Sequence, residues 1–293
     1  MNKPLPLAGG VTPFEIAGFP CSGMDWFARL LALHPQIAFV DARDPLGPIG
    51  GVGMDSDRQS AWGDDVLASI AAALAQKPAA TRVGVVGVEG AFDPLDGPRI
   101  VVLRDGRDVL VHWTLRQLRY HGPTLQRFLA EVSDTRMLEV ARRFAADAGD
   151  VLERNRGLLL CDYKWVRYGG YLWENMVTGL ASALGWSNDH PSDQPDPIDV
   201  RFHEARAAPR ETFDYLVRRL GLDPTQVPPF AVADPVQAAE RDDERLAEWE
   251  ADVWPRWFTA RASKLWKMDG QSGLDSLAGH TVDDEWQGAC PPA

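Results

Sequence analysis

Short runs of apolar residues recur through the first half of the chain, and several are continuous instead of alternating with polar residues. Continuous runs of this length are typical of strands that are buried on both faces of a parallel sheet. The pattern predicts strands over residues 14–19, 37–40, 82–88, 99–104 and 157–163.

Segments with apolar residues at helical spacing lie between and after these runs. They predict helices over residues 24–34, 64–76, 107–119, 124–155, 168–184, 211–220 and 235–267. Strands that alternate with helices form a parallel central sheet with helices on both faces, so we expect a three-layer α/β fold. We expect one domain over residues 1–293, with its core at about 14–267 and tails at 1–13 and 268–293.

Two segments have no hydrophobic period. Residues 44–60 are rich in Gly, Pro and Asp, and neither a strand before them nor a helix after their last glycine supports a dinucleotide-binding fingerprint. We interpret them as a lid or an acceptor-binding loop. Residues 187–200 are polar and rich in proline, which indicates a linker or a surface loop.

Composition narrows the class of protein. A hydrophobic fraction of 45% suits a globular core, and no apolar stretch approaches the roughly 20 residues of a membrane span. No segment resembles a signal peptide, and three widely spaced cysteines support neither a disulfide framework nor a zinc site, so we expect a cytoplasmic protein. The net charge of −12 argues against nucleic acid as a partner, because that affinity depends on Lys and Arg.

The segment from Phe14 to His34 reads as a strand, a tight Pro-Cys-Ser-Gly turn and a helix. Turns of this kind bind anions, because unpaired amides at the helix N-terminus point into them and the helix dipole adds positive charge. The turn lacks the lysine that usually completes such a site. Cys21 stands in that position, and Asp25 adds a negative charge to the first helical turn.

Four segments, in chain order, resemble motifs of the sulfotransferase family. Residues 18–37 are similar to its phosphosulfate loop and following helix, and residues 99–113 to its 3′-phosphate motif. Residues 157–186 look like its adenine-side segment, and residues 252–259 like its C-terminal Trp-containing stretch. The matching positions are Pro20, Ser22, Gly23, Trp26, His34, Pro35, Arg104, Arg107, Asp108, Val109, Tyr163, Trp254, Phe258 and Thr259, while His112 replaces a serine.

The resemblance implies transfer of a sulfuryl group from 3′-phosphoadenosine 5′-phosphosulfate (PAPS) to a hydroxyl or amine of a small molecule or glycan. Adenosine 3′,5′-bisphosphate would be the product, and no metal is implied. It further implies that Glu89 is the general base and that His112 takes part in catalysis; an ordinary exposed carboxylate is the alternative reading of Glu89. The implied donor-binding residues are Pro20, Cys21, Ser22, Gly23, Met24, Asp25, Trp26, Arg104, His112 and Tyr163.

The sequence departs from the family at the donor site. Cys21 replaces the lysine, Met24 and Asp25 replace two threonines, and no Arg-Lys-Gly precedes Trp254. Two hypotheses stay open. In the first, the protein binds the donor in a different way, and Arg107, Arg116 or His112 takes the place of the missing groups. In the second, the chain is a binding protein that keeps the fold without donor chemistry. A third, a P-loop-like kinase, lacks the G-x-x-x-x-G-K-[ST] motif. The sequence gives neither the acceptor nor the oligomeric state.

Overall fold

A computed structural model of the chain describes residues 10–18, 21–40, 68–88, 97–109, 111–112, 197–232, 235 and 254–257. The chain divides into two compact units. The first comprises Met1–Leu103 and Gly179–Trp249, and the second comprises Arg104–Thr178 and Glu250–Ala293. The single domain expected from the sequence stays a prediction.

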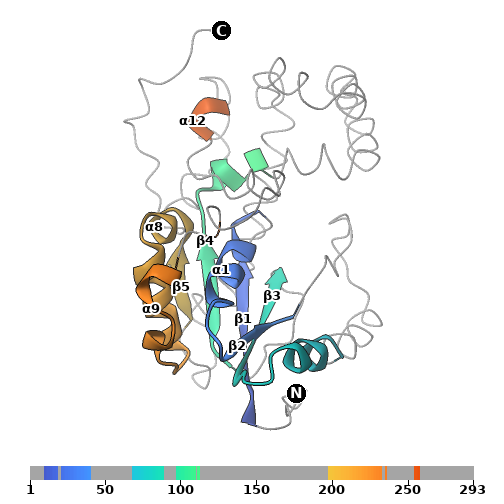
Figure 1. Cartoon of the computed structure of the whole chain (residues 1–293). Helices are drawn as coiled ribbons and strands as arrows, with labels where there is room; N and C mark the ends of the chain where they lie inside the picture. Colours follow the sequence, from blue (N-terminus) through green and yellow to red (C-terminus); the bar gives the residue numbers. More distant parts are fainter. Residues whose placement is uncertain are drawn as a thin grey trace, which may run out of the picture. The chain divides into compact units, whose positions relative to one another are not determined.

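The first unit contains a parallel sheet (Figure 1). Its strands follow the order β2-β3-β1-β4-β5, and every neighbouring pair is parallel. The bounds are β1 (Thr12–Gly18), β2 (Ile37–Phe39), β3 (Arg82–Val88), β4 (Arg99–Leu103) and β5 (Ile198–Arg201). The α/β prediction with a parallel sheet is thereby confirmed, and β1 lies at the centre, so that its carboxyl end is at the middle of the edge where such sheets bind ligands.

Strand β5 corrects the interpretation of residues 187–200 as a linker or surface loop for its last three residues, 198–200, while residues 187–196 lie outside the described residues. Ile198 and Val200 are buried, whereas Asp199 and Arg201 are exposed, and β5 pairs with β4 along its length. A four-residue strand that alternates in this way is too short and too polar for its period to stand out in the sequence.

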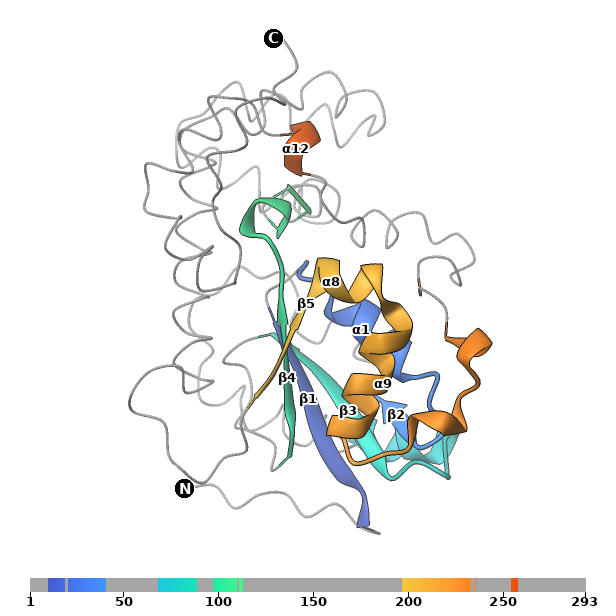
Figure 2. The ribbon, with the colours of Figure 1, turned by 90° about the vertical axis from the view of Figure 1, so that its left-hand side faces the viewer.

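Helices α1 (Met24–Leu31), α8 (Phe202–Ala207) and α9 (Pro209–Arg219) lie on the same side of the sheet (Figure 2). Helix α1 ends before the predicted residue 34, and α9 starts earlier than predicted because Pro209 occupies its first turn, where the missing amide has no cost. Two 3₁₀ turns follow, η2 (Pro224–Gln226) and η3 (Pro229–Ala231). Helix α8 was not predicted, since six residues are too few to show a helical period.

Other predicted elements are described only in part. Residues 68–76 are helical within the predicted 64–76, and residues 106–109 and 111–112 are helical at the start of the predicted 107–119. Helix α12 (Trp254–Trp257) falls within the predicted 235–267. The calls that lie outside the described residues are the strand at 157–163, the helices at 124–155 and 168–184, and the loop at 44–60. No helix in the described part is long and apolar enough to cross a membrane.

The core of the first unit joins the central strands to α1. Phe14 and Ile16 on β1 are completely buried, as are Trp26, Phe27 and Leu30 on α1. A second cluster places the helical residues 68–76 against β2 and β3, through buried side chains that include Ile70, Ala73, Val83 and Val85. These contacts fix α1 against the sheet, and with it the loop from which α1 begins.

Candidate functional site

The candidate site begins where β1 ends. Gly18 is the last residue of β1 and Met24 is the first of α1, so residues 19–23, of which the structure describes 21–23, connect the carboxyl end of the central strand to a helix N-terminus. Ligands of parallel α/β sheets bind at this edge. The predicted loop therefore lies where the sequence placed it, although Pro20 falls outside the described residues.

The backbone of this loop is unusual at two residues. Cys21 has a φ of 68°, in the left-handed region, and Gly23, the N-cap of α1, has a φ of 98°. A left-handed conformation costs a residue with a side chain roughly 1–2 kcal/mol, so the fold holds Cys21 in a strained state. The backbone path is thus imposed by the surrounding structure and not by the local preference of Cys21.

The backbone amides at the N-terminus of α1 are partly unpaired. The amides of Trp26 and Phe27 donate to the Gly23 carbonyl, at 3.0 and 3.4 Å, and no side chain caps the helix. Within the described part of the chain, no hydrogen bond is donated by the amides of residues 22–25. Unpaired amides at a helix start form a site of partial positive charge that suits an anion.

The Ser22 hydroxyl adds a donor to these amides. Ser22 is 1% exposed, and its Oγ has no hydrogen-bond partner among the described residues. The hydroxyl lies beside the end of β1, since a β-carbon placed on Gly18 would be 2.6 Å from Ser22 Oγ. A buried hydroxyl without a partner costs about 1–3 kcal/mol, and an oxygen of a bound anion would remove that cost.

An aromatic cluster holds the loop in place. The Phe202 ring, at the start of α8, packs edge-on against Trp26, with 5.9 Å between ring centroids, and at 6.4 Å from Phe27. The same ring lies against Gly23, where a β-carbon would be 2.3 Å from Phe202 Cε2. Trp26 is completely buried in this cluster, so its side chain packs in the core beneath the loop.

The side chains of the loop carry little positive charge. Cys21 and Met24 are both buried, at 8% exposure, and Asp25 is exposed in the first turn of α1. The carboxylate of Asp25 is favourable for the helix dipole but repels a bound anion. The groups of this loop that could bind an anion are the amides and the Ser22 hydroxyl.

The second unit contains two more of the predicted donor-site residues, Arg104 and His112, and next to Arg104 in the chain a polar cluster of Asp105, Arg107 and Asp108. Arg104, which follows β4 in the chain, is 2% exposed, and His112 is 1% exposed. Asp105 accepts a hydrogen bond from the Arg107 amide at 2.8 Å, which caps the helical segment that begins at residue 106. The Arg107 side chain also donates to Asp105, with 2.9 Å between Nε and Oδ1.

Residues far apart in sequence meet in the same cluster. The guanidinium of Arg107 stacks on the Trp254 ring, 3.6 Å from its centroid, and Asp108 Oδ1 accepts a hydrogen bond of 2.8 Å from the Trp254 amide. Arg107 is thus held by Asp105 and Trp254, which argues against its use as a substitute cation for the donor. Sequence reasoning identified Trp254 only as a family match and gave no signal for its partners.

The predicted site residues are therefore only partly assembled. Residues 21–26 lie together at the end of β1, whereas Arg104 and His112 belong to the second unit, so a donor site shared by both stays a prediction. Glu89, Arg116 and Tyr163 lie outside the described residues. Among the described side chains, no group of His, Cys, Asp and Glu is arranged to hold a metal ion.

Comparison of the chain with protein-family models and with curated proteins finds no match in either. The likeness to sulfotransferases accordingly rests on the four sequence segments and on the chemistry of the loop.

Proposed function

We propose that the chain is a sulfotransferase-like enzyme that transfers a sulfuryl group from PAPS to a hydroxyl or amine of a small molecule or glycan in the cytoplasm. The observation that carries the proposal is the buried Ser22 hydroxyl beside the unpaired amides at the start of α1, at the end of the central strand. Many anions could bind to such a loop, and we infer PAPS because four segments of the sequence resemble sulfotransferase motifs. The proposal includes a three-layer α/β fold of the sulfotransferase type, with helices on both faces of the sheet.

Sulfuryl transfer requires a donor held in line with the acceptor and hydrogen-bond donors on the oxygens that gain charge. In the proposed site, the Ser22 hydroxyl and the amides of residues 22–25 bind the oxygens of the 5′-phosphosulfate. Arg104 binds the 3′-phosphate with two guanidinium N–H groups. Glu89 accepts the proton of the acceptor as its oxygen or nitrogen bonds to sulfur, and adenosine 3′,5′-bisphosphate leaves with the electron pair of the broken S–O bond.

A rival function has its own supporting observation. The loop has no cation to stabilise the leaving oxygen, because Cys21 replaces the lysine, and the cysteine is buried. A binding protein that retains the fold and holds an anion without transferring its sulfuryl group would need no such cation. The two functions predict the same binding but different chemistry.

Donor turnover separates the two functions without knowledge of the acceptor. Radiolabelled PAPS is incubated with the protein and with pools of phenols, alcohols, amines and glycans, and formation of adenosine 3′,5′-bisphosphate and of labelled acceptor is followed. The proposed enzyme yields both in at least one pool, and Ser22→Ala lowers the yield whereas Ser69→Ala, on the helical segment 68–76, does not. Saturable PAPS binding without turnover in any pool supports the binding protein, and absence of PAPS binding contradicts both.

A further inference from the structure

A buried ion pair follows Arg104 directly in the chain. Asp105 and Arg107 both belong to the second unit, and their side chains are only 10% and 12% exposed. Arg107 Nε donates to Asp105 Oδ1 at 2.9 Å and to Oδ2 at 3.2 Å, and Arg107 Nη2 also donates to Oδ2. The carboxylate is thus bound by a guanidinium fork, which is the strong form of such a pair.

Arg107 is the cation that cancels the charge of Asp105. Among the described residues, the only other donor to this carboxylate is the Arg107 amide, 2.8 Å from Oδ1. That bond caps the helical segment that begins at residue 106 and explains why an acceptor is needed at position 105. An amide carries no net charge, so the cap alone would leave a buried negative charge, and the guanidinium removes it.

Arg107 is itself held by a residue from a distant part of the second unit. Its guanidinium lies 3.6 Å from the centroid of the Trp254 ring, and Trp254 is 8% exposed. The Trp254 amide donates to Asp108 Oδ1 at 2.8 Å, which ties the ring to the same helical segment. Stacking on a ring adds to the attraction of the carboxylate, so Arg107 is built as a fixed partner of Asp105.

The charge of Asp105 matters because Arg104 precedes it. Consecutive α-carbons are about 3.8 Å apart, so an uncancelled charge on Asp105 would act at short range on Arg104 and on a phosphate bound there. A buried carboxylate without its cation attracts the next guanidinium and repels a phosphate. Both effects have the same sign, since each weakens phosphate binding at Arg104.

We propose that Arg107 is a positioning residue of the donor site, which cancels the charge of Asp105 so that Arg104 binds the 3′-phosphate of the donor and not this carboxylate. Arg107 acts through Asp105, and Trp254 fixes Arg107 in the geometry that this requires. The inference rests on the proposed function, and within it on the contact between Arg104 and the 3′-phosphate.

The test measures how much the 3′-phosphate contributes to binding. Calorimetry on the full chain at low salt gives the ratio of the Kd of adenosine 5′-phosphate to the Kd of adenosine 3′,5′-bisphosphate. Damage to the fold weakens both ligands and leaves this ratio unchanged, whereas a charge at the 3′-phosphate changes it. Arg107→Met should lower the ratio about fivefold or more, which is the effect of one charge about 8 Å from a dianion even at the dielectric constant of water.

Substitution of Asp105 separates charge cancellation from packing. Asp105→Asn keeps an oxygen for the helix cap but leaves Arg107 with an uncancelled positive charge, so it should raise the ratio; this arm holds even where Arg107→Met fails to fold. Arg107→Met combined with Asp105→Asn has no uncancelled charge and should return the ratio to within about twofold of the wild type. Both Arg107→Met proteins lack the stack on Trp254, so a ratio that stays low in the double variant contradicts the proposal, as does an unchanged ratio in Asp105→Asn.

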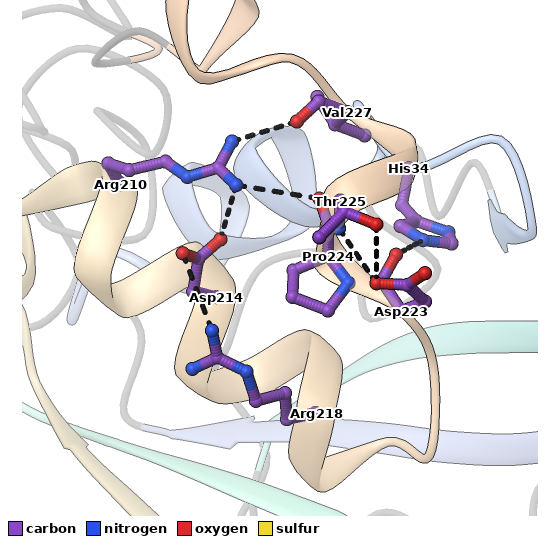
Figure 3. A network of polar contacts seen from close by, with 8 residues as sticks. All are labelled: His34, Arg210, Asp214, Arg218, Asp223, Pro224, Thr225 and Val227. Atoms are coloured by element: carbon purple, nitrogen blue, oxygen red, sulfur yellow. Dashed lines mark hydrogen bonds and ion pairs between the residues drawn. The ribbon is translucent and has the colours of Figure 1, made fainter.

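An arginine–aspartate pair on α9, in the first unit, is the matched control (Figure 3). Arg210 Nη2 lies 2.7 Å from Asp214 Oδ1, and the two side chains are 24% and 22% exposed. Like Arg107, Arg210 belongs to a wider set of contacts, because it donates at 2.9 Å to the carbonyl of Val227, in the turn whose Asp223 carbonyl lies 3.1 Å from His34 Nε2. Arg210→Met should leave the ratio unchanged, and a fall equal to that in Arg107→Met would attribute the effect to net charge and overturn the proposal.

The same titrations distinguish failure of this inference from failure of the proposed function. A wild-type ratio near unity means that Arg104 does not bind a 3′-phosphate, which contradicts the proposed donor site and the role of Arg107 with it. A wild-type ratio well above unity that Arg104→Ala abolishes and Arg107→Met leaves unchanged supports the donor site and overturns the role of Arg107 alone.

Discussion

The ring of Phe202 lies so close to Gly23 that a β-carbon on the glycine would approach Phe202 Cε2 to 2.3 Å. The glycine caps α1 in the left-handed conformation, and the phenylalanine opens α8 directly after β5. An element that the sequence did not predict therefore sets the conformation of the loop that the sequence did predict.

Gly23→Ala should destabilise the protein in two ways, because the position is left-handed and because the new β-carbon would collide with the Phe202 ring. The left-handed backbone costs alanine roughly 1–2 kcal/mol, and crowding against the ring adds about 1–3 kcal/mol. In a Phe202→Ala background only the backbone cost remains, so the two substitutions should be strongly non-additive. Urea unfolding of the two single variants and the double variant measures this coupling, and additive free energies of unfolding would show that ring and glycine do not constrain each other.

Ser22→Ala should raise the stability of the ligand-free protein. The substitution removes a buried hydroxyl that lacks a partner among the described residues, and relief of an unsatisfied group of this kind is worth about 1 kcal/mol. The urea midpoint of Ser22→Ala is compared with that of Ser69→Ala, which removes a serine hydroxyl outside the loop. A loss of stability in Ser22→Ala alone would mean that this hydroxyl already has a structural role.

Asp25→Asn should tighten the binding of adenosine 3′,5′-bisphosphate a few-fold at low salt. The exposed carboxylate in the first turn of α1 repels a dianion at the loop, and salt screens that repulsion. The matched control is Glu211→Gln, which removes an exposed charge from the first turn of α9. Calorimetric titration at low and high salt should show a gain in affinity for Asp25→Asn that shrinks with salt. An equal gain in affinity for the control would mean that the effect comes from the net charge of the protein and not from the position of Asp25.

Arg99→Met should make the stability of the protein depend more strongly on pH. Arg99 Nε donates to the buried Glu15 Oε2 at 2.8 Å, across the β1–β4 pair. Burial raises the pKa of Glu15, and Arg99 opposes that rise, so its removal raises the pKa further. An acid whose folded pKa is raised destabilises the fold as pH rises from its unfolded pKa, near 4.3, through the folded value.

The variant should consequently be less stable than the wild type at pH 7, by about 3 kcal/mol, because an unpaired carboxylate stays buried. The difference should shrink as pH falls and Glu15 takes up a proton. Urea midpoints between pH 5 and 7.5 measure this, and a difference that is constant over that range would exclude Glu15 as its source.

The sequence predicted those parts of the fold that long periodic segments encode. The continuous apolar run of β3 gave its bounds correctly, and the Pro-Cys-Ser-Gly turn placed the loop before α1. Strand β5 and helix α8 were not predicted because they are short. Pairing with β4 sets the position of β5, and the burial of Phe202 sets that of α8. Such tertiary contacts override local pattern.

The candidate site was likewise predictable from the sequence only in part. Ser22 was identified from its place in the turn, but its burial without a partner could not be read from residue type. The stacking of Arg107 on Trp254 and the bridge from His34 to Asp223 join residues that are 147 and 189 positions apart, and no periodicity links them. Contacts of this range follow from the fold as a whole.

Calorimetric binding of adenosine 3′,5′-bisphosphate is the most direct test of the claim that the loop at residues 21–25 is a phosphate site. The wild type should bind the bisphosphate and not adenosine, and Ser22→Ala should bind it about tenfold or more weakly, since a hydrogen bond to a charged group is worth roughly 1.5–3 kcal/mol. Ser69→Ala should bind as the wild type does. Equal affinities of Ser22→Ala and Ser69→Ala, or wild-type affinity no greater for the bisphosphate than for adenosine, would contradict the account.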